Sequence, residues 1–232
     1  RLGAAIARLF HAQGMKLVIH YLGSEAAARA LQQELHQARA ESVMLVRGDL
    51  NHSEKLLKNL VYETVESFGR LDVLVNNAAR FYPTPVGAAT EEQWSDIVGT
   101  NLKAPFFLSQ AALPHLRKSG GCILNIADIY GDRPLAKHAI YSIAKAGLIM
   151  LTKSLAREFG PEVRVNAIAP GAILWPETGL DDMSKQRVIS RTPLKRSGNP
   201  EDIARTALFL VRDADFITGQ VLAVDGGRWV VM

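Results

Sequence analysis

Apolar residues along the chain follow two alternating patterns, one with the period of a helix and one typical of buried strands. In the stretch 2–14, Ile6, Leu9 and Phe10 fall on one helical face, and Gly14 can end the helix. The next stretch, "MKLVIH", is a short continuous apolar run, as expected of a strand that is covered on both faces. The two patterns continue to alternate to the end of the chain.

This alternation predicts the order of elements. Helices are expected over 24–38, 53–68, 91–117, 139–159 and about 200–211, and strands over 43–48, 71–77, 122–127, 164–170 and 220–225. The segment 171–198 carries Pro, Gly and mixed charge, which suits a loop with a short helix. Strands that alternate with helices indicate parallel strands joined by right-handed crossovers. The sequence therefore predicts an α/β fold, a doubly wound, mostly parallel Rossmann-type sheet with helices on both faces, in one domain spanning residues 1–232.

The start of the chain departs from this plan, because Arg1 leads directly into a helix. A dinucleotide-binding fold has a strand before that helix, which ends in a glycine-rich turn. That strand would lie at the centre of the sheet, and its loss would leave backbone groups on both neighbours unpaired at about 1–3 kcal/mol each. We expect the natural chain to extend upstream by one strand and most of a turn. An in-frame stop codon immediately before Arg1 would contradict this.

Composition narrows the class of protein. A charge of +4, from 27 basic and 23 acidic residues scattered along the chain, gives little support for nucleic acid as a partner. No apolar run approaches the ~18 residues of a membrane span, so no membrane association is expected. The lone Cys122 excludes an internal disulfide framework and suits a reducing cytoplasm. The six histidines do not fall at metal-ligand spacing, so no metal site is predicted.

Tyr141 and Lys145 lie four positions apart, so a helix would place both on one face. A phenol titrates near ~10, and a neighbouring ammonium lowers that pKa because it stabilises the phenolate. The pair could therefore act as a general acid at neutral pH. The same spacing also occurs by chance, so the pair alone does not establish a site.

Further motifs follow the predicted strands in a fixed order. These are "NNAA" at 76–79, Asn101 inside a predicted helix, "PG" at 170–171 and "VDGG" at 224–227. With the Tyr141–Lys145 pair, they make the chain resemble the short-chain dehydrogenase/reductase family over its full length. The resemblance implies a nicotinamide cofactor, often a homotetramer, and catalytic roles for Asn101, Tyr141 and Lys145. It also implies that Lys145 holds the nicotinamide ribose and that Asn101 anchors a water. The position of the family's catalytic serine is occupied by Asp128.

Four features together resemble the pteridine reductases: Asp128, "RLG" at 1–3, "HY" at 20–21 and "FYPTP" at 81–85. The loop "ILWPETG" at 173–179 resembles that of the bacterial branch. The resemblance implies a pterin that lies between Phe81 and the nicotinamide. A carboxylate can accept from pterin N–H groups, and a protonated carboxyl group can supply a proton as hydride arrives at a C=N carbon. Two simpler interpretations remain open: Asp128 could mark an inactive enzyme, and Phe81 could be an ordinary core aromatic.

The strand that ends in "VIHYLGS" lacks the carboxylate that NAD-selective sites use to bind the ribose, and we therefore predict NADPH. Ser24, at a helix N-terminus, is a natural site for a 2′-phosphate, with Arg1 as a nearby cation. The complete predicted set of cofactor contacts is Arg1, Leu2, His20, Tyr21, Ser24, Asp49, Leu50, Asn77, Ala78, Lys145, Pro170 and Gly171. The predicted substrate contacts are Arg1, Phe81, Asp128, Tyr141, Leu174 and Trp175, of which the last two belong to a lid at 173–179.

The leading functional hypothesis is NADPH-dependent reduction of a pterin, such as a dihydropterin to its tetrahydro form, with proton donation by Tyr141 and Asp128. One alternative is a carbonyl reductase of the 3-oxoacyl-carrier-protein type, in which Asp128 is tolerated. Another is a non-catalytic NADPH-binding protein. The resemblance also implies a homo-oligomer, a dimer or a tetramer, with subunit contacts through the helices at 101–117 and 139–159.

Overall fold

The computed structural model describes residues 1–51, 54–175 and 181–231. Its strands are β1 (Leu17–Tyr21), β2 (Val43–Arg47), β3 (Val73–Asn76), β4 (Cys122–Ile126), β5 (Arg164–Pro170) and β6 (Val221–Val224). The α-helices are α1 (Leu2–Ala12), α2 (Glu25–Ala38), α3 (Glu54–Phe68), α4 (Glu91–Val98), α5 (Ala104–Ser119), α6 (Ala139–Phe159), α7 (Asp182–Arg191), α8 (Pro200–Arg212) and α9 (Arg228–Val231). Three shorter helical segments are η1 (Val86–Ala88), η2 (Gly99–Lys103) and η3 (Ile129–Gly131).

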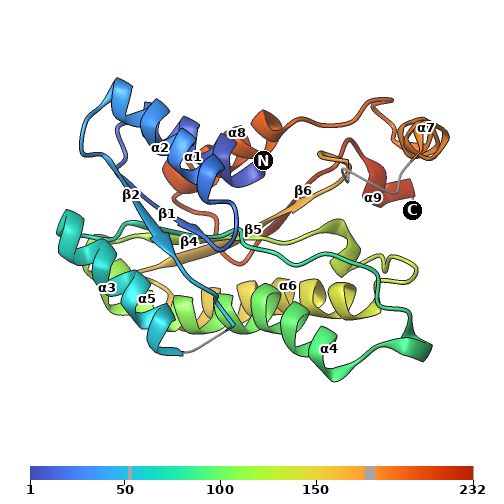
Figure 1. The fold of residues 1–232 in the computed structure, drawn as a ribbon, viewed down its shortest axis with the longest axis horizontal. Helices are drawn as coiled ribbons and strands as arrows, with labels where there is room; N and C mark the ends of the chain where they lie inside the picture. Colours follow the sequence, from blue (N-terminus) through green and yellow to red (C-terminus); the bar gives the residue numbers. More distant parts are fainter. Residues whose placement is uncertain (52–53, 176–180, 232) are drawn as a thin grey trace.

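All the strand pairs in these residues are parallel, which confirms the predicted α/β fold. β1 pairs with β2, and a four-stranded sheet has the order β3-β4-β5-β6. Figure 1 shows α1, α2 and α8 on one face of the strands and α3, α5 and α6 on the other. β4 and most of β5 are buried, as expected of strands that are covered on both faces.

The strands fall into two sheets that do not pair with each other in the described residues, because β1 and β3 share no ladder. α1 packs against both sheets. Its Ala7 belongs to an apolar cluster with Val43, and its Ile6 and Phe10 belong to another with Ile168. The break lies where the doubly wound order places a central strand. A strand upstream of Arg1 stays a prediction.

A chain of buried polar side chains connects β3, β4 and α6. Asn76 Nδ2 donates to Asn125 Oδ1 at 2.8 Å, and Asn125 Nδ2 donates to Thr152 Oγ1 at 2.9 Å. Thr152 then donates to the carbonyl oxygen of Leu148 on its own helix at 2.8 Å. All three polar side chains are at most 6% exposed. Each of these buried polar side chains therefore has a hydrogen-bond partner among the others.

The structure differs from the predicted elements mainly in short helical segments, among them η1 and η3, which the sequence analysis did not predict. The expected continuous helix over 91–117 is interrupted by η2, a π-helical segment, so that α4 and α5 are separate helices. The sequence analysis also missed α9, whose four residues are too few to produce a periodic signal.

α6 is long and apolar enough to cross a membrane by length and composition alone. However, 56% of its apolar window is buried in the protein, and it packs against β5 and η3. It is therefore a core helix of the fold, in the part of the chain that the structure describes.

Candidate functional site

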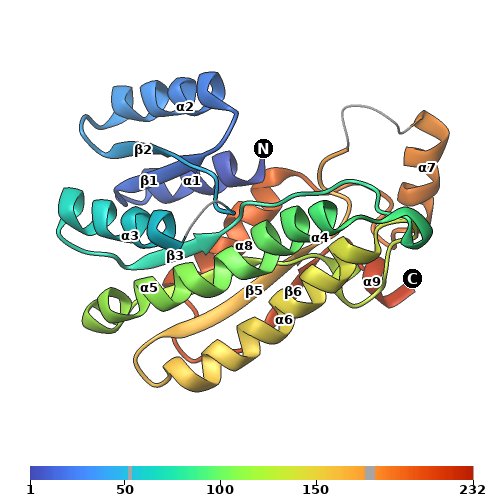
Figure 2. The ribbon, with the colours of Figure 1, turned by 60° about the horizontal axis from the view of Figure 1, so that its bottom comes forward.

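The predicted site forms at the carboxyl end of β4, where η3 and the start of α6 meet. Asp128 lies two residues after the end of β4 and is the N-cap residue of η3. Tyr141 and Lys145 lie in the first two turns of α6, and both are buried. Figure 2 shows α6 passing beneath β5 and β6, with the loops that follow the strands gathered at one end. The fold thus brings together residues that are up to 17 positions apart, from 128 to 145.

Asp128 and Tyr141 form a direct hydrogen bond. The Tyr141 hydroxyl donates to Asp128 Oδ2 at 2.7 Å, and the backbone N–H of Tyr130 donates to Asp128 Oδ1 at 2.9 Å. Both carboxyl oxygens therefore have a donor, and this fixes the orientation of the carboxyl group. The prediction that the acid at position 128 lies beside the phenol is confirmed.

The surroundings of this pair favour the protonated form of both groups. Burial raises the pKa of the Asp128 carboxyl, and the hydrogen bonds from Tyr130 and Tyr141 and the charge of Lys145 oppose that rise only in part. Burial, together with the neighbouring Asp128 carboxylate, also raises the pKa of Tyr141 well above its usual value near 10. The expectation that Lys145 lowers the pKa of this phenol is wrong here, because desolvation and the nearer carboxylate outweigh the ammonium.

Lys145 is only 2% exposed, and its Nζ donates to the backbone carbonyl of Ile126 at 2.7 Å. The same atom lies 5.7 Å from the centre of the Tyr141 ring. Burial lowers the pKa of Lys145 to about 8, and the nearby Asp128 carboxylate opposes this shift. Consequently the lysine changes its charge near physiological pH, which an exposed lysine does not do.

Asn101 lies in η2 and is 1% exposed. Its Nδ2 donates to the carbonyl oxygens of Ile97 and Arg80, each at 2.9 Å, and its Oδ1 accepts from the backbone N–H of Arg80 at 3.3 Å. Asn101 therefore fixes the chain that follows β3 against the π-helical turn. Asn101 thus lies at a π-helical interruption of the predicted helix, and π-helical turns are frequent at functional sites. Its role as an anchor for a water stays a prediction.

An aromatic wall stands beside the Tyr141 hydroxyl. The Phe81 ring stacks on the His138 ring, with the ring centroids 4.7 Å apart. It forms a T-shaped pair with the Tyr141 ring, with the centroids 4.8 Å apart. Phe81 is 46% exposed, so it is not an ordinary core aromatic. The backbone N–H of Thr84 donates to the carbonyl of Lys137 at 2.6 Å and joins the two loops of the wall.

The sequence analysis missed His138 because an isolated histidine in a loop gives no chemical signal. Its position three residues before Tyr141, at the N-cap of α6, could have identified it. The N-cap side chain of a helix lies near the first turn, where Tyr141 is located.

The residues predicted to bind a cofactor lie at the ends of β1, β2, β3 and β5. A Cβ on Gly3 would lie 2.7 Å from Asn77 Nδ2, so the first turn of α1, with Arg1 and Leu2, is close to the end of β3. Ala78 is exposed beside Asn77. A Cβ on Gly171, which follows Pro170, would lie 2.7 Å from the Asp225 Cα, so this turn approaches the end of β6 equally closely. The fold therefore groups these predicted contacts at one edge of the strands.

The end of β1 has the donors that a phosphate requires. Ser24 is the N-cap residue of α2, yet its side chain makes no capping hydrogen bond, so the hydroxyl at this helix N-terminus is free for a ligand. β1 ends in His20 and Tyr21, with no carboxylate that would repel a phosphate. These residues fit a nicotinamide dinucleotide with a 2′-phosphate.

The neighbouring predicted contacts have structural partners. His20 Nε2 lies 2.7 Å from the carbonyl oxygen of Gly48, and burial lowers the pKa of this histidine. Asp49 Oδ1 accepts from the Asn51 backbone N–H at 2.9 Å, and Leu50 packs against a core cluster between α3 and α5. Leu50 is therefore mainly a packing residue.

The predicted lid at 173–179 lies in part outside the described residues, which resume at 181. Ile173 is buried, Leu174 is exposed and Trp175 is partly buried. The assignment of Leu174 and Trp175 to the wall of a substrate pocket stays a prediction.

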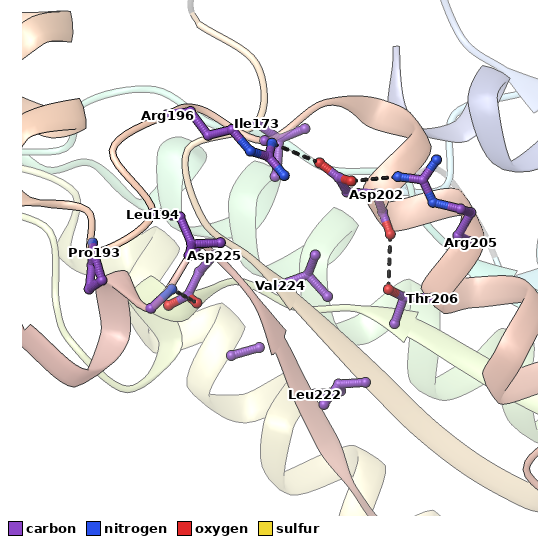
Figure 3. Close-up of a pocket in the computed structure, with 14 residues that line it drawn as sticks. Ile173, Pro193, Leu194, Arg196, Asp202, Arg205, Thr206, Leu222, Val224 and Asp225 are labelled. Carbon is purple, nitrogen blue, oxygen red and sulfur yellow. Dashed lines mark hydrogen bonds and ion pairs between the residues drawn. The ribbon is translucent and has the colours of Figure 1, made fainter.

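A cavity of about 630 Å³ lies away from the Asp128–Tyr141 pair, between β6, α8 and the loop after α7. Figure 3 shows Asp202 accepting from Arg205 at 2.6 Å and from Arg196 at 3.3 Å, while Thr206 donates to the Asp202 carbonyl at 2.9 Å. The charged groups of this cavity thus neutralise one another. Its described lining contains none of Asn101, Asp128, Tyr141 and Lys145, so we assign no chemistry to it.

Comparison with known proteins gives consistent matches along the chain. A family model described as enoyl-(acyl carrier protein) reductase matches residues 2–228. A granaticin polyketide synthase protein of Streptomyces violaceoruber, named as a ketoacyl reductase, is 40% identical over 97% of this chain and 91% of its own length. The 3-oxoacyl-[acyl-carrier-protein] reductases of Staphylococcus aureus and Chlamydia trachomatis are each 36% identical. Those matches cover 99% and 97% of this chain and 94% and 92% of the relatives.

Fold, site and matches together define the class as an oxidoreductase built on a doubly wound α/β sheet. The chain belongs to the short-chain dehydrogenase/reductase family. The relatives named above are oxoacyl and ketoacyl reductases, whereas the sequence analysis favoured the pteridine reductase branch. The choice between these substrates concerns the site rather than the fold.

Proposed function

We propose that this chain is an NADPH-dependent reductase whose substrate is a 3-oxoacyl thioester. The observation that carries the proposal is the 2.7 Å hydrogen bond between Tyr141 and Asp128, beside the buried ammonium group of Lys145. The names of the relatives, which are oxoacyl and ketoacyl reductases, support a carbonyl compound as the substrate. They support it better than they support a pterin.

The residues that would hold NADPH are those at the strand edge. Ser24 would bind the 2′-phosphate, the first turn of α1 and Asn77 would lie along the dinucleotide, and Lys145 would donate to the nicotinamide ribose. When bound, the cofactor supplies a hydride to the substrate. β1 itself ends without the carboxylate that NAD-selective sites use to bind the ribose hydroxyls, which favours a 2′-phosphate.

The proton chemistry belongs to Asp128 and Tyr141. The oxygen of a substrate carbonyl at this site would accept from the Tyr141 hydroxyl, which would turn from Asp128 toward it. Burial raises the pKa of the Asp128 carboxyl, and in its protonated form this group would be a second donor to the carbonyl oxygen as negative charge develops there. Tyr141 would release its proton to that oxygen, and Lys145 would stabilise the resulting phenolate.

A second candidate substrate, a pterin, is favoured by Asp128 and Phe81. A carboxyl group can accept from N–H groups of a heterocycle, which a serine hydroxyl does less well, and Phe81 offers a half-exposed aromatic face beside Tyr141. A flat ring on this face would gain about 0.5–1.5 kcal/mol beyond its burial.

Loss of nicotinamide absorbance separates the two candidates. The purified chain would be mixed with NADPH and either acetoacetyl thioester or dihydrobiopterin, with Tyr141→Phe as the matched control. We expect oxidation of NADPH with the thioester and a loss of about 10²–10⁴ in rate for Tyr141→Phe. Turnover of dihydrobiopterin alone would transfer the assignment to the pterin. Binding of NADPH without turnover of either compound would indicate a non-catalytic protein.

The exposed faces of α5 and α6 support a further part of the proposal, a homo-oligomer. Phe106 on α5 and Ile143 and Met150 on α6 are between 43% and 59% exposed. Large exposed apolar side chains on adjacent helices are typical of subunit interfaces.

A further inference from the structure

The C-terminal helix α9 lies against the turn that carries Asp128. Trp229, in α9, donates through its indole N–H to Asp132 Oδ2 at 2.7 Å. Asp132 is the residue that ends η3, and Asp128 is the residue that begins it. The two segments are 97 positions apart in the sequence, so this bond connects the end of the described chain to the site.

The turn before α9 directs Trp229 to this position. Gly226 and Gly227 have φ values of +66° and +85°, which other residues rarely adopt. Asp225 accepts from the backbone N–H of Gly227 at 2.9 Å and from that of Trp229 at 2.5 Å. The backbone of Trp229 is therefore held by a carboxylate at the end of β6.

The Trp229 ring packs against a buried cluster that flanks Asp128. The cluster consists of Ala127, Ile129, Ala167 and Ala169. Ala127 and Ile129 are the residues directly before and after Asp128, so Trp229 packs on the same apolar cluster that anchors the Asp128 turn. The indole N–H holds the far end of the same turn at Asp132.

The turn that carries Asp128, η3, is also packed closely against α6. A Cβ on Gly131 would lie 2.9–3.0 Å from the backbone of Lys145, so η3 already rests on α6. The groups that face Asp128 are Tyr130 from η3 and Tyr141 and Lys145 from α6. Arg133 lies 3.6 Å from the Asp132 carboxylate and is largely exposed. η3 is therefore held by its packing against α6 and by the Trp229–Asp132 hydrogen bond from α9.

We propose that Trp229 is a positioning residue, which holds the Asp128 turn against α6 and keeps the carboxyl group buried beside Tyr141. The catalytic importance of Asp128 rests on the proposed function, whereas the physical link between Trp229 and Asp128 does not. Trp229 acts through the turn, because it contacts neither the phenol nor a reacting atom in this arrangement.

The test combines carbon NMR with enzyme kinetics. The titration of the Asp128 carboxyl carbon would be followed in protein labelled at aspartate, with Asp128→Asn to assign the signal. Trp229→Ala removes both the ring and the indole N–H, and Trp229→Phe restores an apolar ring without the N–H. Trp94→Phe is the matched control, because Trp94 is half-exposed on α4.

We expect Trp229→Ala to lower the pKa of Asp128 toward its ordinary value, because the carboxyl group gains water. Trp229→Phe should restore part of the shift, and Trp94→Phe should leave it unchanged. In parallel, kcat should fall on the order of tenfold to a hundredfold in Trp229→Ala, and its pH profile should move with the Asp128 titration. If Trp229→Ala does not fold, the smaller change in the Asp128 pKa in Trp229→Phe is the deciding measurement.

An Asp128 titration that is identical in wild type and both Trp229 variants would overturn the inference, even if thermal stability fell. If the Asp128 titration shifts in the Trp229 variants but the wild-type protein reduces neither the thioester nor the pterin, the proposed function is refuted and the positioning role is supported. The two failures are therefore distinguishable.

Discussion

Asp128 is subject to opposing demands of stability and chemistry. A carboxyl group surrounded by protein loses hydration when it ionises, and its two hydrogen bonds, from Tyr130 and Tyr141, replace that hydration only in part. The same burial raises the pKa of the group, which is the direction that favours proton donation. Residues in functional sites often lower the stability of the fold for this reason.

Asp128→Asn should lower turnover strongly and raise thermal stability at neutral pH. The folded-state pKa of Asp128 lies above its unfolded value, so stability falls as pH rises from the unfolded pKa through the folded one. The neutral amide avoids that loss, and each kcal/mol regained raises Tm by roughly 2–4 °C. Calorimetry from pH 3.5 to pH 8 tests this, and the gain should vanish at the acid end. A lower Tm for the variant at pH 8 would contradict the expectation.

Lys145 should make cofactor binding depend on pH. Its pKa of about 8 is lowered from 10.5, so the ammonium group that would bind ribose hydroxyls is lost as pH rises above about 8. We expect the dissociation constant for NADPH, measured by fluorescence titration, to increase above that pH. Lys145→Met should bind more weakly at pH 7 and show no such dependence. A flat wild-type profile between pH 7 and pH 9.5 would show that Lys145 does not contact the cofactor.

The sequence predicted which residues form the site but not their ionisation. The spacing of Tyr141 and Lys145 placed both on one helical face, and the order of strand and turn brought Asp128 to them. The rise in the Tyr141 pKa was not predictable, because it depends on the depth of burial and on the distance to the carboxylate. His138 was missed because its role depends on Phe81, which is distant in sequence.

At the scale of single elements, short turns determine the geometry of the site. η2 places Asn101 against the loop after β3, and η3 places Asp128 against α6. Neither turn has a periodic signature, so the sequence predicted one helix over 91–117 and no helical turn after β4. Long helices were predicted well, because their many apolar positions outweigh any local irregularity. α6 has the predicted bounds of 139–159.

Gly131→Ala should disturb the site from within η3. The added methyl group would lie within 3.0 Å of the Lys145 backbone, which cannot move without displacing α6. Overpacking of this kind costs about 1–3 kcal/mol, and the displaced turn should reduce turnover as well. Gly87→Ala is the matched control, because its methyl group would meet nothing within 4 Å. Thermal unfolding and steady-state rates measure both effects, and equal behaviour of the two variants would contradict the packing argument.

For the whole molecule, alternating apolar patterns predicted the layered fold because each crossover must cover one face of the strands. Six strands at nearly the predicted positions and the helices on both faces agree with that prediction. The division into two sheets could not be read from any local pattern, since it depends on which strands become neighbours. A single domain over 1–232 stays a prediction.

Met150→Glu should change the oligomeric state. Met150 lies on the outer face of α6 and is 59% exposed, and a carboxylate buried in a subunit interface would be strongly unfavourable. We expect sedimentation to give a dimer or tetramer for the wild type and smaller species for this variant. Met183→Glu on α7 is the matched control and should sediment like the wild type. A monomeric wild type would contradict the proposed assembly.

The buried polar chain Asn76–Asn125–Thr152 has a consequence for specificity. A slide of α6 by one turn, about 5.4 Å, would strand an amide and a hydroxyl in apolar surroundings and would simultaneously withdraw the phenol from its acid. A packing with α6 shifted by one turn is therefore less stable, and it also lacks the arrangement of Tyr141 and Asp128 that the reaction requires. Selection against misfolding and selection for activity would then favour the same position of α6.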